Sequence, residues 1–295
     1  MKIERQNIID QEINKQGFVL VPAMSEMLKC SEETIRRDLK EMESQGRLMR
    51  THGGAYLIEN FDKTYPTNLR KAYYHQTKDC LARRAIEHMQ ENDIVMLDSS
   101  TTCLALAEAM IRSQKMLTVI TNSLQICLLC NESNINNINL ICPGGAFRRR
   151  TSSFADQHTI DMLRTYHADR AFISCPKLTV EYGLSDNHLS EARVRETMLK
   201  QSQERYLIVD HTKFNSSANI LFEGLELVDT IITDQKLDED WERYIASRGI
   251  KSTEASESGH LKRRSLFVLL RATATDPSQT ADKAPNQGTS ALRSC

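Results

Sequence analysis

The sequence has no apolar run long enough to cross a membrane, and its first six residues lack the apolar core of a signal peptide. We therefore expect a cytoplasmic protein. Neither sign of charge dominates, because 38 Lys and Arg face 39 Asp and Glu, so net charge excludes no class of partner. A chain of 295 residues can bury a large core, and usual domain sizes predict two compact units.

Common catalytic motifs are also missing from the sequence. It has no Ser-His-Asp order, no H-E-x-x-H metal cluster and no G-x-x-x-x-G-K phosphate loop. We therefore expect no catalytic residue, no metal and no cofactor. An enzyme remains an alternative, because four residues could in principle carry out acid-base isomerisation: Asp98, Glu191, Asp210 and Lys213.

The 8 cysteines are scattered along the chain. Several, including Cys103, Cys127 and Cys142, lie in apolar stretches, which predicts reduced, buried thiols and no disulfides. Cys127 and Cys130 form a C-x-x-C, but no second Cys or His pair at zinc spacing lies nearby. We expect this segment to be a buried helix.

Hydrophobic periodicity divides the chain into four parts. Residues 1–57 show helical periodicity and then a short alternating segment, and residues 58–72 are a polar linker. Six short apolar runs separated mostly by helix-length spacers follow, at 93–98, 117–122, 139–142, 169–174, 206–210 and 229–234. This alternation predicts a largely parallel α/β domain over residues 73–249. Residues 250–295 have a composition typical of a disordered tail.

The N-terminal part predicts three helices, of which the third, at 31–45, is the most informative. Ser31 is a good N-cap, and Ile35, Leu39 and Met42 repeat at i, i+4 and i+7, so they must face the core. Five polar residues of this helix then point elsewhere, and we predict that they contact DNA: Glu33, Thr34, Arg36, Arg37 and Lys40.

After Gly46, the chain predicts two short strands around a glycine turn, a wing that carries Arg50 and His52 toward the DNA backbone. The alternative is a small structural or protein-binding helical bundle with solvated charges. Residues 1–57 hold nine basic and nine acidic side chains, so the DNA hypothesis depends on where the arginines lie and not on their number.

Two stretches of the N-terminal part resemble the signature of the DeoR family of bacterial sugar-metabolism regulators. They are Ser31-Glu32-Glu33-Thr34-Ile35-Arg36-Arg37-Asp38-Leu39 and Arg50-Thr51-His52-Gly53-Gly54-Ala55, with Gly46-Arg47-Leu48 between them. The resemblance implies a winged helix-turn-helix whose third helix reads an operator. Thr34, Arg36 and Arg37 match the family's DNA-facing positions.

Polar residues follow several of the predicted strands, at the edge where open α/β sheets bind their ligands. Hydroxyls and helix N-terminal amides suit a phosphate or a sugar, a double glycine lets a ligand approach the backbone, and a lysine supplies a charge. The predicted ligand-binding residues are Asp98, Ser99, Ser100, Thr101, Thr102, Thr121, Asn122, Ser123, Gly144, Gly145, Asp210 and Lys213.

These loops are similar to those of the DeoR sensor domain, so the resemblance spans roughly residues 1–249. It implies a fold similar to sugar-phosphate isomerases and a phosphorylated sugar as inducer. Some loops depart from the family pattern, as where Ser100 replaces the expected glycine and Thr212 replaces serine, and the whole chain has 11 glycines. Added β-carbons could narrow the pocket, change the ligand or abolish binding.

Together with the resemblance, the sequence predicts a transcriptional regulator that represses a carbohydrate-metabolism operon. A phosphorylated sugar bound to the C-terminal domain is expected to control this regulator. Its predicted partners are double-stranded operator DNA, the effector and other copies of the chain. A dimer or tetramer is expected because two half-sites need two DNA-reading helices. The alternatives are an isomerase-like enzyme and a constitutive, ligand-free DNA-binding protein.

Overall fold

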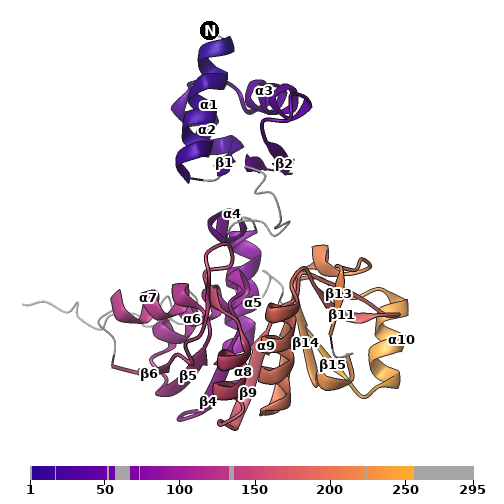
Figure 1. Ribbon diagram of the computed structural model, residues 1–295. Coiled ribbons are helices and arrows are strands. Elements are labelled where there is room, and N and C mark those ends of the chain that lie inside the picture. The colour runs from indigo at the N-terminus through magenta and orange to yellow at the C-terminus, as the bar shows by residue number, and fades with distance from the viewer. Residues whose placement is uncertain are drawn as a thin grey trace, which may run out of the picture. The chain divides into compact units, whose positions relative to one another are not determined.

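The computed structural model describes residues 2–16, 18–51, 53–56, 67–72, 74–132, 136–222 and 225–255 (Figure 1). Residues up to 56 and residues from 67 onward form two folded regions. Among the described residues, no helix combines the length and the apolar character needed to cross a membrane.

The N-terminal region is a winged helix-turn-helix, as predicted. Its helices are α1 (Lys2–Gln16), α2 (Val21–Met27) and α3 (Glu32–Ser44). Its strands β1 (Phe18–Leu20), β2 (Met49–Thr51) and β3 (Gly54–Tyr56) form an antiparallel sheet in the order β1-β3-β2. The sequence did not predict β1. Apolar residues from all three helices, including Ile9, Met24 and Leu39, form one buried core.

The C-terminal region is built on a seven-stranded parallel sheet in the order β15-β14-β12-β9-β4-β5-β6. The strands are β4 (Ile94–Leu97), β5 (Leu117–Thr121), β6 (Ile138–Ile141), β9 (Ala168–Ile173), β12 (Ser202–Ile208), β14 (Thr230–Thr233) and β15 (Lys251–Glu254). Six of them coincide with the predicted apolar runs, which confirms the parallel α/β architecture. β15 was not predicted.

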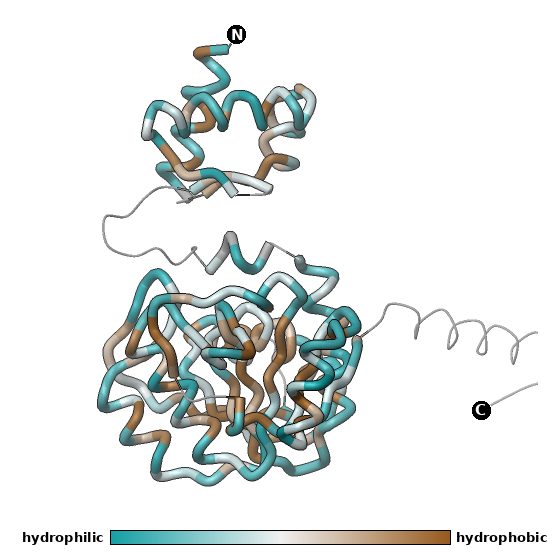
Figure 2. Tube along the Cα trace, turned by 90° about the vertical axis from the view of Figure 1, so that its right-hand side faces the viewer, coloured by the Kyte–Doolittle hydropathy of each residue, from teal (hydrophilic) through white to brown (hydrophobic). Residues whose placement is uncertain are grey.

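Helices cover both faces of this sheet. On one face lie α5 (His75–Ile86), α6 (Thr101–Ser113) and α7 (Leu124–Glu132), and on the other lie α8 (Gln157–Leu163), α9 (Leu189–Lys200) and α10 (Glu239–Ser247). Each face of the sheet packs against its helices in a separate hydrophobic core, and successive strand residues alternate between the two cores. Val95 and Leu97 belong to the core under α5, α6 and α7, and Met96 belongs to the core under α8, α9 and α10. Figure 2 shows hydrophobic residues along the strands inside this layered structure.

Shorter elements complete the C-terminal region. A small antiparallel sheet contains β10 (Lys177–Thr179), β11 (Gly183–Asp186) and β13 (Ile220–Leu221), and β7 (Phe147–Arg148) pairs with β8 (Ser153–Phe154). Single turns of 3-10 helix occupy His211–Lys213 and Leu225–Leu227.

Two predicted boundaries differ from the structure. The linker was expected to reach residue 72, but α4 (Thr67–Ala72) is helical, while 58–66 lie outside the described residues. The disordered tail was expected from residue 250, but β15 pairs with β14 over residues 251–254, because these polar residues lie at the sheet edge and needed no apolar pattern. Residues 256–295 lie outside the described part of the chain.

The strand order reverses between β4 and β9. From β4 the chain first runs outward through β5 and β6, and later through β9, β12, β14 and β15 on the other side. Connections leave these two neighbouring strands in opposite directions, which opens a crevice at their carboxyl ends.

Candidate functional site

Helix α3 has the start and the buried side that the sequence predicted. The hydroxyl of Ser31 accepts a hydrogen bond from the amide of Thr34 at 3.3 Å, which caps the first turn. Ile35, Leu39 and Met42 are fully buried against the rest of the region.

The opposite side of α3 faces solvent. Glu33, Arg36, Arg37 and Lys40 are exposed, and Thr34 is half-buried. Arg36 pairs with Glu32 one turn earlier at 2.6 Å, with both side chains more than 40% exposed, so the pair holds Arg36 only weakly. Arg37 forms no ion pair within the described residues, and its guanidinium group is available to an external partner.

Asp38, on the same helix, is buried and fixes the helix in place. The guanidinium group of Arg5 on α1 donates to both carboxylate oxygens of Asp38, one at 3.1 Å. This bidentate pair ties α1 to α3 and has a structural role.

The wing holds Arg50 against the end of α3. The amide of Arg50 donates to the Glu43 carboxylate at 2.8 Å, and its guanidinium group lies 3.1 Å from the same carboxylate. Arg50 remains partly exposed. His52, the other predicted wing contact, lies outside the described residues.

A cavity of about 490 Å³ lies beside the crevice where the strand order reverses. In the C-terminal region it is lined by Arg70, Tyr74, Lys78, Ser100, Thr101, Thr102, Ser174, Cys175, Pro176, Lys177, Asn187, Arg195, Asp210, Thr212, Lys213, Ser217 and Ala218. The predicted ligand residues among them are Ser100, Thr101, Thr102, Asp210 and Lys213.

Ser100, which stands where the family pattern has glycine, does not close the cavity. Its hydroxyl accepts a hydrogen bond from the amide of Cys103 at 3.0 Å and caps α6. The added β-carbon is therefore part of a helix cap at the cavity wall.

Asp98 lies behind the cavity wall, although it was predicted to contact the ligand. It is buried, and its carboxylate accepts hydrogen bonds from the Arg195 Nε at 2.6 Å and from the amides of Ser100 and Ser174 at 3.0 and 3.2 Å. Arg195 also pairs with the buried Asp186. The sequence missed this ion-pair network, which fixes the loops after β4 and β9 and places Arg195 in the cavity wall.

Six other predicted ligand residues also lie outside the cavity lining: Ser99, Thr121, Asn122, Ser123, Gly144 and Gly145. The hydroxyl of Ser99 donates to the buried Glu191. The hydroxyl of Ser123 accepts from the amide of Ile126 at the start of α7, and Asn122 Nδ2 donates to the Phe154 carbonyl at 2.9 Å. These side chains stabilise the fold.

Gly144 and Gly145 lie in a turn that packs against the first residues of α8. Both have positive φ, and the Gly144 carbonyl accepts a hydrogen bond from the hydroxyl of Thr159 at 2.7 Å. A Cβ on Gly145 would lie 2.2 Å from that hydroxyl, so glycine is required by close packing within the chain.

The cavity wall is strongly cationic. Of its positively charged residues, the sequence predicted only Lys213. Arg70, Lys78, Lys177 and Arg195 also line it. Burial and the positive charges of Lys213 and Arg70 lower the pKa of Lys78 from 10.5 to about 7. Burial and the charge of Lys213 also lower the pKa of Lys177. These amines repel one another when no anion is present.

Comparison with known families identifies both regions. Residues 5–61 match the DeoR-like helix-turn-helix domain, and residues 74–235 match the DeoR C terminal sensor domain. The chain belongs to the DeoR family. The C-terminal region is thus its sensor domain, and the resemblance inferred from the sequence is confirmed.

DeoR-family relatives of this chain have opposite regulatory names. The L-fucose operon activator of Escherichia coli is 32% identical over 238 residues, covering 80% of this chain and 96% of the relative. The glycerol-3-phosphate regulon repressor of Escherichia coli is 28% identical over 233 residues, covering 78% and 90%. Among solved structures, ribose 5-phosphate isomerase A from Neisseria gonorrhoeae aligns with 47% of this chain and 53% of its own, with 16% identity and a TM-score of 0.33.

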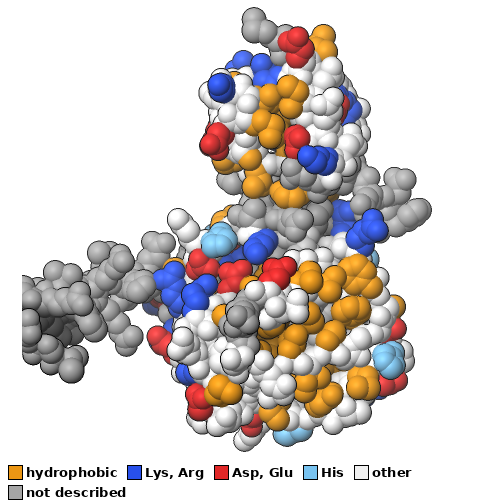
Figure 3. All heavy atoms as spheres, turned by 90° about the vertical axis from the view of Figure 1, so that its left-hand side faces the viewer, with side chains coloured by type: hydrophobic (Ala, Val, Ile, Leu, Met, Phe, Trp, Pro, Cys, Tyr) orange, Lys and Arg blue, Asp and Glu red, His pale blue; other side chains and the backbone are white. Residues whose placement is uncertain are grey.

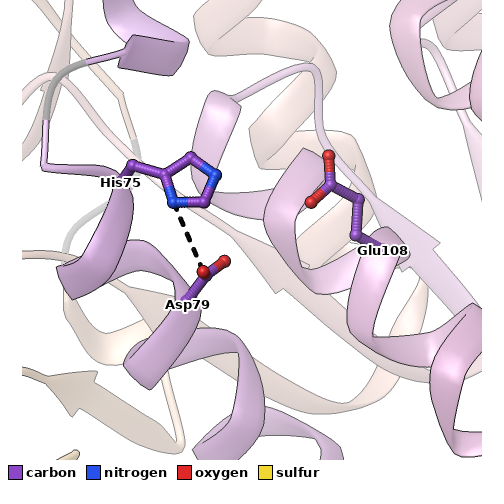
Figure 4. A group of neighbouring side chains, drawn as sticks. All are labelled: His75, Asp79 and Glu108. Carbon is purple, nitrogen blue, oxygen red and sulfur yellow. Dashed lines mark ion pairs between the residues drawn. The ribbon is translucent and has the colours of Figure 1, made fainter.

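One group of potential metal ligands lies within the described part of this DeoR-family sensor domain. Figure 4 shows His75 and Asp79 one turn apart on α5 and Glu108 on the neighbouring α6. His75 Nδ1 lies 3.3 Å from the Asp79 carboxylate, while Glu108 pairs with Lys71 at 3.3 Å. The ammonium group of Lys71 already neutralises Glu108, and we assign no metal to this group.

Glu191 was considered as an acid-base residue in the enzymatic alternative. It is buried, accepts hydrogen bonds from the hydroxyls of Ser153 and Ser99 at 2.6 and 3.2 Å, and lies 3.3 Å from Arg148 Nε. Its carboxylate is saturated by the protein and does not line the cavity. The two Escherichia coli relatives are named as an operon activator and a regulon repressor, and not as enzymes.

Proposed function

We propose that this DeoR-family chain is a transcription factor that binds operator DNA through α3 and changes its DNA affinity when a phosphorylated metabolite occupies the sensor cavity. It would act where the chromosome is accessible, in the cytoplasm. Oligomers are expected, because two half-sites require two copies of α3.

The excess of positive charge around the cavity carries the ligand proposal. Five cationic side chains and one carboxylate, that of Asp210, line the cavity, and Asp210 lies 3.7 Å from Lys213. A phosphate monoester carries about −1.5 to −2 charges at neutral pH, which complements this cationic lining. Such a ligand would relieve the repulsion between Lys78, Lys177 and Lys213.

A calorimetric titration of the full chain tests the ligand class. We expect glycerol 3-phosphate or members of a panel of sugar phosphates to bind at least tenfold more tightly than the same compounds without phosphate. Lys177→Met should weaken binding, whereas Lys71→Met on the outside of α4 should not. If no phosphorylated compound binds or changes operator affinity, the constitutive DNA-binding alternative is favoured.

The DNA contact is tested by Arg37→Ala. Loss of one guanidinium contact in a groove typically costs about 1–3 kcal/mol, so operator affinity should fall roughly tenfold or more. Arg243→Ala, an exposed arginine on α10, is the matched control. Circular dichroism should show both variants folded. Wild-type operator affinity in Arg37→Ala would remove Arg37 from the interface.

We propose that DNA binding represses a carbohydrate operon. Activation is the alternative, because one relative is named an activator and another a repressor. The choice depends on where the operator lies relative to the promoter. Deleting the gene in its host and measuring transcripts of neighbouring genes decides between them, because loss of a repressor raises transcription and loss of an activator lowers it.

A further inference from the structure

Helix α4 (Thr67–Ala72) lies in the chain between the residues that match the two DeoR-family models, 5–61 and 74–235. The family comparison therefore assigns it no role. Arg70 on this helix nevertheless lines the ligand cavity, and it precedes every other lining residue of the C-terminal region in the sequence. The cavity thus contacts the first described helix that follows the winged helix-turn-helix.

Two cavity-lining side chains hold the backbone of α4. The carbonyl of Arg70 accepts hydrogen bonds from the ammonium group of Lys78 on α5 and from the hydroxyl of Thr101 on α6, the second at 3.4 Å. The last four carbonyls of a helix have no partner within it, and that of Arg70 is among them. Because a helix of six residues is not stable alone, α4 depends on such contacts with the sensor domain.

The side chain of Arg70 also links α4 to its surroundings. Its Nη2 donates to the hydroxyl of Thr67 at 3.1 Å, and this hydroxyl donates to the carbonyl of Arg150, between β7 and β8, also at 3.1 Å. A guanidinium group carries five N–H donors in a planar fork, which matches a phosphate group better than a single ammonium group does. Arg70 therefore connects α4 to the cavity through both its backbone and its side chain.

The charge of Arg70 opposes the packing of α4 when no anion is bound. Lys78, Arg195 and Lys213 line the same cavity. Burial and the charge of Arg195 lower the pKa of Arg70, but a guanidinium group stays protonated at neutral pH. On the outer surface of the C-terminal region, by contrast, Figure 3 shows Lys and Arg next to Asp and Glu. A bound phosphate attracts Arg70 and thereby stabilises the packing of α4 against the sensor domain.

We propose that Arg70 binds the phosphate of the effector, and that this contact makes α4 the element through which ligand binding acts on the winged helix-turn-helix. The inference rests on the proposed function and names the residue and the helix that carry it. An occupied cavity fixes α4, and with it the point in the chain from which residues 57–66 lead back to the winged helix. Because a ligand stabilises the arrangement to which it binds more tightly, the position of α4 and operator affinity are then coupled.

Hydrogen exchange of the full chain measures the packing of α4 directly. Glycerol 3-phosphate, the panel of sugar phosphates and inorganic phosphate serve as probes. At saturation, a probe that binds the wild type should slow exchange of the amides of α4 roughly threefold or more and leave those of α10 unchanged. This measurement needs no variant, so it does not depend on how a substituted chain folds.

Arg70→Met tests the residue itself. It should weaken binding of the same compound roughly tenfold, because a hydrogen bond to a charged group is lost. At saturation it should also abolish the slower exchange of α4 and the change in operator affinity. Arg70→Lys, which keeps the charge without the planar fork, should retain part of each effect. Arg243→Met, on the exposed side of α10, is the matched control and should behave as wild type.

Failure of this inference differs from failure of the proposed function. If the wild type binds a phosphorylated compound and its operator affinity changes, but exchange of α4 stays the same or Arg70→Met responds like the wild type, the inference is overturned and the proposed function stands. If the wild type binds no phosphorylated compound, both are wrong.

Discussion

Lys78 places a primary amine in the cavity wall beside two other cations. Its side chain is buried and donates to the backbone carbonyl of Arg70, so part of its hydrogen-bonding capacity is satisfied within the chain. Burial and the repulsion from Lys213 and Arg70 favour its neutral form near pH 7. A bound anion would favour the charged form, which couples ligand binding to proton uptake.

Lys78 should make the stability of the ligand-free protein depend on pH. Between about pH 7 and 10.5 the unfolded chain binds a proton that folded Lys78 does not, so the free energy of unfolding rises with pH, by up to about 1.4 kcal/mol per unit. Below about pH 7 both states are protonated and this slope vanishes. Urea unfolding of wild type and Lys78→Met measures the difference.

The expected result is a shallower rise with pH in Lys78→Met. Lys71→Met, whose lysine is exposed on α4, should keep the wild-type slope. Equal slopes in wild type and Lys78→Met would show that Lys78 stays charged in the folded cavity.

At the scale of elements, the wing depends on a close approach between β1 and β3. Leu20 pairs with Gly54, and a Cβ on Gly54 would lie 2.1 Å from the Val19 carbonyl oxygen, which belongs to the backbone. Gly46, after α3, has φ of +71° and open space around it. The two glycines are therefore required for different reasons, packing at Gly54 and backbone conformation at Gly46.

Alanine substitutions should separate these reasons. Gly54→Ala forces β1 and β3 apart and should cost about 3 kcal/mol or more, whereas Gly46→Ala meets only the left-handed backbone penalty of about 1–2 kcal/mol. Hydrogen exchange of the full chain should show faster exchange at the Leu20 and Gly54 amides in Gly54→Ala. Equal destabilisation by both substitutions would mean that the strands can separate without cost.

At the scale of the whole molecule, the parallel sheet contains one strand, β15, that the pattern of apolar runs did not predict. β15 adds hydrogen bonds from Lys251 and Ala255 amides to the carbonyls of Asp229 and Thr233, at 2.9 and 2.8 Å. Ile250 and Ala255 are both buried at its ends. The last strand is thus part of the sensor domain although its own residues are polar.

Two truncations test this boundary. Ending the chain after Gly249 removes β15 and the buried Ile250 and should lower the free energy of unfolding by about 2–4 kcal/mol. Ending it after Ala255 should leave the stability close to that of the full chain, in line with the prediction of a disordered tail. Thermal unfolding of both shows the difference, and equal melting temperatures would contradict a structural role for β15.

Much of the architecture followed from the sequence because periodicity reports burial directly. Ile35, Leu39 and Met42 at helical spacing predicted the buried side of α3, and six apolar runs predicted six parallel strands. Five of the twelve predicted ligand-binding residues line the cavity. A polar residue after a strand can bind a ligand or cap a helix, and its sequence neighbours do not decide which.

The local pattern of residues determined the winged helix, the parallel sheet and the exposed arginines of α3, since each depends on spacing within one segment. The tertiary structure alone decided that Asp98 pairs with Arg195, that Gly145 packs on Thr159, and that Arg70 and Lys78 reach the cavity. The physical reason is distance along the chain: Asp98 and Arg195 are 97 positions apart, and no local periodicity records a contact over such a separation.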